Sequence, residues 1–161
     1  MLCDVLLNTA GSITGNTVTF QSTNGTGTTI KGSSQIDTSG YTPSGTARDF
    51  GEGQALYGRF EIGTAASGGT SVEFQVVAAD DAALSTNAVV IGTTGAIAVA
   101  SATAGARFAC PIAPRLASKG QRYIGTQVVT VGAVTAMTSF HDIGAEIQDG
   151  QKFYASGFAV S

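Results

Sequence analysis

Regular alternation of apolar and polar residues is the feature that most constrains how this chain can fold. Residues 56–62 and residues 72–76 each place three apolar side chains on one face of an extended strand. A period of two residues is that of a half-buried β-strand, because successive side chains point to opposite faces. The segment between them, Ala66-Ser67-Gly68-Gly69, has the composition of a hairpin turn. These patterns predict antiparallel strands joined by tight turns.

Strand patterns of this kind recur at intervals of roughly ten residues. The further strands that we expect lie at 12–14, 17–20, 88–91, 97–102 and 107–112, followed by a hairpin of 122–131 with 134–140. Residues 80–84 are expected to form one capped helical turn. The 22 glycines are about twice the usual share, and long helix-forming residues are sparse. The fold class predicted is all-β, a jelly-roll-like antiparallel sandwich of about eight strands with extended terminal segments.

The length of 161 residues fits a single β-sandwich domain over 1–161. Residues 1–20 are an N-terminal arm or the first strands. Residues 21–54 are rich in Gly, Thr and Ser and are expected to form a long loop region, which in a compact domain is usually functional. Residues 55–161 contain the sandwich core and a C-terminal tail, of which 151–160 is amphipathic.

The charge content is low and argues against several classes of partner. The net charge is −3 and only 12% of residues are charged, about half the usual share. No run of Lys or Arg is present, so we expect no nucleic-acid binding. No apolar segment is long enough to span a membrane or to serve as a signal sequence, so we expect a soluble protein with no membrane partner. A surface this poor in charge indicates that much of it lies against other protein.

The two cysteines give neither a metal-ligand spacing nor a disulfide framework. We expect Cys110 to be a small strand residue and Cys3 a free thiol, as suits a protein made in a reducing cytoplasm. A disulfide between them is the alternative.

The search for catalytic residues finds no convergent set. His141 is the only histidine, and on a strand it would face away from its neighbour Asp142, so we interpret it as a structural or surface residue and not a catalytic one. Glu61 and Glu73 lie on neighbouring expected strands, which is the placement of a glycosidase acid pair, but the sugar-stacking Trp is missing.

Two further motifs have ordinary structural explanations. Asp80-Asp81 lacks a calcium-loop spacing and is better explained as a helix cap. Residues 25–31 lack the Gly-Lys-Ser/Thr ending of a phosphate loop. We therefore expect no enzyme activity, no cofactor and no metal site.

A series of segments from residue 47 onward resembles a known family. The series begins with Ala47-Arg48-Asp49-Phe50-Gly51-Glu52-Gly53-Gln54-Ala55-Leu56-Tyr57 and continues through 72–76, 79–85, 94–97, 107–111 and 122–124 to 153–158. In this order the segments resemble the capsid cement (decoration) proteins of tailed bacteriophages of the Bordetella-phage type. About two-thirds of the chain is covered. The chain departs from the family pattern in a longer Gly/Thr-rich stretch at 21–45 and in Phe140-His141-Asp142, which replaces a more aliphatic stretch.

The resemblance implies a non-catalytic virion protein on the outer surface of the capsid, made in the cytoplasm of the bacterial host. Such a protein bridges subunits of the major capsid protein and stabilises the shell against the pressure of packaged DNA. Its implied partners are the major capsid protein and copies of itself, as a dimer or a trimer. The alternatives are another phage structural β module of the tail, fibre or head-completion type and, further off, a carbohydrate-binding jelly-roll module.

Three groups of residues are candidates for partner contacts. The apolar N-terminal residues are expected to dock as an arm or to form an ordinary first strand, because extended termini often add strands to a neighbour. The charged pair would lock a loop or cross a subunit boundary, and the aromatic residues of the tail would anchor it on a partner or close one end of the sandwich. The candidates are Leu2, Val5, Leu6 and Leu7, then Arg48 and Asp49, and finally Tyr154 and Phe158.

Overall fold

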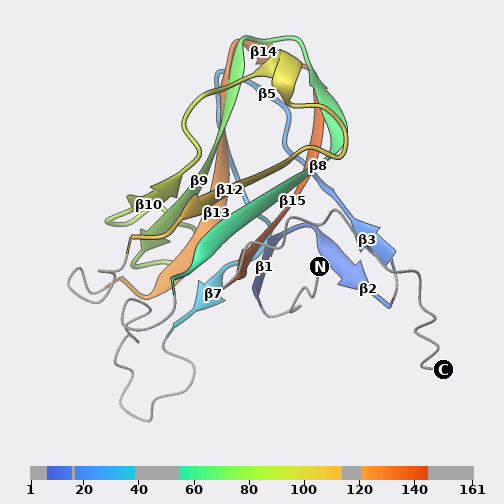
Figure 1. The fold of residues 1–161 in the computed structure, drawn as a ribbon. Helices are drawn as coiled ribbons and strands as arrows, with labels where there is room; N and C mark the ends of the chain where they lie inside the picture. The colour runs from blue at the N-terminus through green and yellow to red at the C-terminus, as the bar shows by residue number, and fades with distance from the viewer. Residues whose placement is uncertain (1–6, 16, 39–54, 114–120, 145–161) are drawn as a thin grey trace, which may run out of the picture.

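The computed structural model describes residues 7–15, 17–38, 55–113 and 121–144. Within these ranges the regular structure consists of β-strands and one short 3-10 helix, η2 (Val99–Ser101), with no α-helix. Two antiparallel sheets face each other across a common core (Figure 1). The predicted all-β class is therefore confirmed.

Each sheet is built around two long central strands. The first sheet runs in the order β1 (Asn8–Ala10), β15 (Ala136–Gly144), β8 (Tyr57–Ser67) and β12 (Arg107–Pro111), and β4 (Gln21–Ser22) also pairs with β15. The second runs in the order β10 (Val89–Thr93), β9 (Ser71–Ala79), β13 (Tyr123–Val131) and β6 (Thr29–Lys31), and β11 (Ile97–Ala98) and β7 (Ile36–Asp37) pair with β9 and β13 respectively.

The strand order identifies the topology. Three pairs of short strands each occupy one strand position in a sheet, so that each sheet has four strand positions. The pairs are β1 and β4, β6 and β7, and β10 and β11. Strands β8 and β15 are neighbours in the first sheet. The strand that follows β8 in the chain, β9, and the long strand that precedes β15, β13, are neighbours in the second sheet. The chain is thus an antiparallel ribbon folded over on itself, which is the jelly roll that the sequence predicts.

The two turns expected to be hairpins have a different structure. β8 and β9 lie in different sheets and do not pair with each other, and the same holds for β13 and β15. Each turn is an arch that carries the chain across the core, and the arches pair with each other through Thr70 N–H to Val131 O (2.7 Å) and Thr135 N–H to Ser67 O (2.8 Å). The interpretation as hairpins was wrong because alternating strands around a glycine turn fit both arrangements. The arch buries the apolar faces of both strands against each other.

Residues 21–38, expected to be part of a long loop, contain four short strands. These are β4, β5 (Gly25–Thr26), β6 and β7. β4 pairs with β15, β5 pairs with β14 (Ala133–Val134), and β6 and β7 both pair with β13. Strands of two or three residues with largely exposed side chains carry no alternation signal, so the sequence did not reveal them. Residues 39–54 lie outside the described residues.

Two other predicted local elements can be compared with the structure. The strands expected at 12–14 and 17–20 form a hairpin of β2 (Ser12–Thr14) and β3 (Thr17–Thr19), which pair only with each other. The helical turn expected at 80–84 is a non-helical turn closed by the Leu84 N–H bond to Asp81 O at 3.0 Å.

The core between the sheets is thin and contains small side chains around two aromatic rings. Phe60 of β8 and Phe74 of β9 stack across the core with ring centroids 4.9 Å apart. Most of the other buried apolar residues are Val, Ile and Ala, and Cys110 is buried among them as a free thiol, as predicted. Cys3 lies outside the described residues.

Candidate functional site

The core contains a chain of hydrogen-bonded polar side chains centred on His141. Its Nδ1 lies 2.8 Å from Thr126 Oγ1, and its Nε2 lies 2.7 Å from Ser139 Oγ. Thr126 continues to Thr9 of β1 at 2.9 Å, and Ser139 continues to Thr23 at 2.9 Å. The five side chains are all buried, so this network joins the N-terminal segment to β13 and β15.

The environment of His141 keeps its imidazole neutral. The ring is fully buried and packs in T-shaped geometry against Phe60 and Phe74, at centroid distances of 5.0 and 5.5 Å. Burial lowers the pKa of His141 from 6.5 to about 3, because the charged form loses its hydration. A neutral ring with both nitrogens bonded and no exposed surface is a structural residue, which confirms the interpretation made from the sequence.

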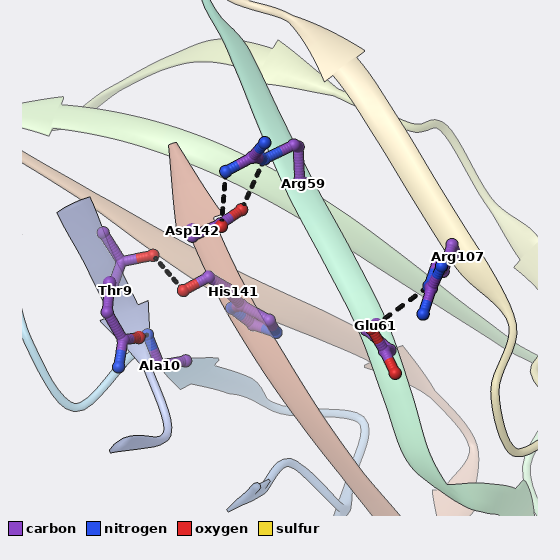
Figure 2. Close-up of polar contacts among 8 residues, drawn as sticks. Thr9, Ala10, Arg59, Glu61, Arg107, His141 and Asp142 are labelled. Atoms are coloured by element: carbon purple, nitrogen blue, oxygen red, sulfur yellow. Dashed lines mark hydrogen bonds and ion pairs between the residues drawn. The ribbon is translucent and has the colours of Figure 1, made fainter. Parts of the chain in front are cut away.

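Asp142 faces away from His141, as predicted, and forms an ion pair with an arginine on the outer face of the first sheet. Arg59, its register partner on β8, donates through Nε to Oδ1 at 2.7 Å and through Nη2 to Oδ2 at 2.5 Å (Figure 2). The Asp142 side chain is 1% exposed and that of Arg59 is 15% exposed. This bidentate geometry fixes the register of the two central strands.

The carboxylates of Glu61 and Glu73 are not brought together. Glu61 lies in the first sheet and binds Arg107 on the neighbouring strand at 3.1 Å (Figure 2). Glu73 lies in the second sheet and accepts hydrogen bonds from Thr93 Oγ1 at 2.6 Å and Gln75 Nε2 at 2.7 Å. These bonds, Gln75 first, lower the pKa of Glu73. The geometry of a glycosidase acid pair is therefore absent from these two residues.

Asp81 stabilises the turn after β9 through hydrogen bonds to the next turn of chain. Its carboxylate accepts bonds from Ser85 Oγ (2.6 Å), Ser85 N–H (2.8 Å) and Thr86 N–H (2.7 Å). These bonds, the Ser85 hydroxyl first, lower the pKa of Asp81 to about 2. Asp80 accepts a bond from Asn87 Nδ2 at 2.6 Å. In the described part of the chain, no three His, Cys, Asp or Glu side chains come together as metal ligands.

Of the interface candidates chosen from the sequence, Leu7 alone falls within the described residues. It is half-buried and directly precedes β1. Leu2, Val5, Leu6, Arg48, Asp49, Tyr154 and Phe158 lie outside the described ranges, and their roles remain predictions. No helix in the described ranges is both long enough and apolar enough to cross a membrane.

The sequence reasoning missed a surface that only the fold assembles. Four of the chain crossings between the sheets, from β4 to β6, β8 to β9, β11 to β12 and β13 to β15, lie at one end of the sandwich, where Figure 1 shows β5, β14 and η2 together. We call this end of the sandwich the arch face; it is built by residues 22–30, 62–72, 94–106 and 128–140, some of which, such as Ile62 and Val128, point into the core. None of them is Asp, Glu, Lys, Arg or His. Because the face combines four distant segments, overall charge content was the only sequence signal for it.

Comparison with known proteins places the chain in a family. The model of the family Bbp16 matches residues 6–141, which includes the whole arch face and both sheets except the last three residues of β15. A search of curated proteins found no match. The chain therefore belongs to the Bbp16 family, whose name indicates a protein of a Bordetella phage.

Proposed function

We propose that this protein is a capsid cement protein, which binds the outer surface of a phage head and bridges subunits of the major capsid protein. The observation that carries the proposal is the family match over residues 6–141. The jelly roll and the low charge content agree with it.

The physical role of such a protein is to add contacts across the seams of the shell. Packaged DNA pushes the shell outward, so each added contact raises the free energy needed to separate two subunits. A single contact can be weak, because many copies act together and binding to the assembled state stabilises that state.

The proposed role is non-catalytic, with neither a cofactor nor a metal. The polar groups that first attract attention are used internally, with His141 in the core network and Asp142 bound to Arg59. The partners are the major capsid protein and copies of the chain itself, as a dimer or a trimer. The terminal candidates would contribute strand-addition or anchoring contacts; they are Leu2, Val5, Leu6 and Leu7 at the N-terminus and Tyr154 and Phe158 at the C-terminus.

Heat disruption of phage heads tests this function. Heads that lack the protein are mixed with purified protein, and DNA release is followed on heating by the fluorescence of a DNA-binding dye. We expect the protein to sediment with the heads and to raise the temperature of DNA release. The proposal fails if the purified, folded protein neither sediments with heads nor changes the release temperature.

A further inference from the structure

The arch face is a preformed surface, held by backbone hydrogen bonds between its four segments. Gly27 N–H donates to Gly132 O at 3.0 Å, and Ala66 N–H donates to Ala102 O at 2.9 Å. Val99 N–H donates to Thr70 O at 3.2 Å, which ties η2 to the neighbouring arch. A surface cross-linked in this way loses little conformational entropy when a partner binds, which favours rigid docking.

Charged residues are present in the described chain but lie outside the arch face. The pairs Arg59–Asp142 and Arg107–Glu61 lie on the first sheet, while Arg122–Asp37 lies at the opposite end of the sandwich. The turn that contains Asp80 and Asp81 follows β9 at that same opposite end. Lys31 and Glu73 lie on the second sheet, directly next to arch-face residues 30 and 72. Among the described residues, the sandwich therefore has one end without charged side chains and one end with them.

The arch face also exposes apolar area. Val131 is 52% exposed at the end of β13, the largest exposed fraction among the large apolar residues described. The adjacent residues Gly132 and Ala133, and Gly68 and Gly69 on the paired arch, are exposed as well. An uncharged surface that exposes apolar side chains is typical of an interface and is a solubility risk for a surface that stays in water.

We propose that the arch face is the surface by which this protein docks on the phage shell, and that it meets an equally uncharged surface of the shell subunit. The inference rests on the proposed function and adds an orientation to it. Charge complementarity supports it, because a charged partner surface would lose its hydration against the arch face without gaining an ion pair.

The distribution of charge favours the shell over a second copy as the occupant. Two copies joined through their arch faces would both direct their charged ends outward, so a charged end with Arg122, Asp37, Asp80 and Asp81 would meet the shell. Docking through the arch face instead leaves that charged end in solvent.

A matched pair of lysine substitutions tests the orientation. Val131→Lys places a charge on the arch face, and Val90→Lys places the same charge on β10, where the valine is similarly exposed at 45%. Each variant and the wild type are titrated onto heads that lack the protein, and bound copies are counted by sedimentation. We expect Val131→Lys to weaken binding at least about tenfold, because the lysine is buried without a partner, while Val90→Lys and the neutral Val131→Thr bind as the wild type does.

Further measurements keep each outcome decisive. Thermal unfolding shows whether each variant is folded, and Ala100→Lys on η2 replaces Val131→Lys if the latter does not fold. Wild-type binding is expected to change little between about 0.05 and 0.5 M NaCl, because no charges meet in the interface.

Three results would overturn the proposed orientation. These are equal binding of Val131→Lys and Val90→Lys, steep weakening of wild-type binding by salt, and a soluble dimer that Val131→Lys dissociates while head binding is unchanged. In each of them the wild type still binds heads, so the cement function stands. Absence of wild-type binding would instead refute the cement function, and the orientation with it.

Discussion

Thr126 Oγ1 lies 2.8 Å from the Nδ1 atom of His141, in the centre of the core between the two sheets. This hydrogen bond links β13 of the second sheet to β15 of the first. Through Thr9, which bonds to the same hydroxyl at 2.9 Å, it also includes the N-terminal strand. The sandwich is therefore joined across its core by polar contacts as well as by apolar packing, and its stability should depend on the protonation of one buried ring.

The stability of the fold should fall as the pH is lowered below about 6.5. The pKa of His141 is about 3 in the folded protein and 6.5 in the unfolded chain, so between these values the unfolded chain binds one more proton. The contribution is complete above about pH 6.5 and is lost toward about pH 3, with a slope of at most about 1.4 kcal/mol per pH unit. Urea unfolding at pH 5.0, 6.0 and 7.5 measures the slope.

The control for this prediction is His141→Gln, which removes the titrating group. The variant is expected to be less stable at pH 7.5 but to have a nearly flat dependence between pH 5.0 and 6.5. The pKa values of Glu73 and Asp81 are lowered, so these carboxylates titrate at lower pH and do not produce a slope between pH 5.0 and 6.5. An equal slope in the wild type and the variant would show that His141 is not responsible.

Thr126→Val should destabilise the protein by about 1–3 kcal/mol, because it leaves buried polar groups without their partner. His141 Nδ1 loses its partner, and Thr9 Oγ1 keeps only its long bond to the His141 carbonyl oxygen at 3.4 Å (Figure 2). In a double-mutant cycle with Thr9→Val, the two changes should be clearly non-additive. Additive losses of stability would indicate that the two hydroxyls act independently.

Asp142→Ala should cost about 3 kcal/mol or more, because it leaves the largely buried Arg59 guanidinium without this carboxylate. The matched control is Glu61→Ala on the outer face of the same sheet, where Arg107 and Glu61 are 35% and 25% exposed. That change should cost less than about 1 kcal/mol. Chemical denaturation of both variants gives the comparison, and similar losses would argue against a special role for the Arg59–Asp142 pair.

Cys110 should resist thiol reagents in the folded protein. It is buried, and burial raises the pKa of its thiol to about 11, so almost no thiolate forms near neutral pH. In a Cys3→Ser background, labelling by a thiol reagent should follow the rate of global unfolding. Complete labelling within seconds under native conditions would contradict the described position of this residue.

The fold class was predictable because strand alternation is a local signal. Phe60 and Phe74 alternate with polar neighbours, and they indeed face each other across the core. The partners of the strands were not predictable in the same way. A glycine turn such as Gly68-Gly69 looks the same in sequence whether the next strand pairs beside the first or crosses to the other sheet.

The sites depended still more on three-dimensional assembly. The opposite orientation of His141 and Asp142 followed from strand geometry, but the partners Thr126 and Arg59 are distant in sequence and could not be named. The arch face could not be foreseen for the same reason. Each of its four segments is an ordinary run of Gly, Ala, Ser, Thr and Val, and the absence of charge becomes a surface property only when the folded ribbon brings them together.

The most direct test of the cement function is a cryo-EM map of the phage head that carries this protein. We predict many copies of the jelly roll on the outer surface, positioned over the seams between major capsid subunits, with the end that contains β5, β14 and η2 toward the shell. A map with this protein in the tail or the connector alone, or with none of it on the head, would contradict the account.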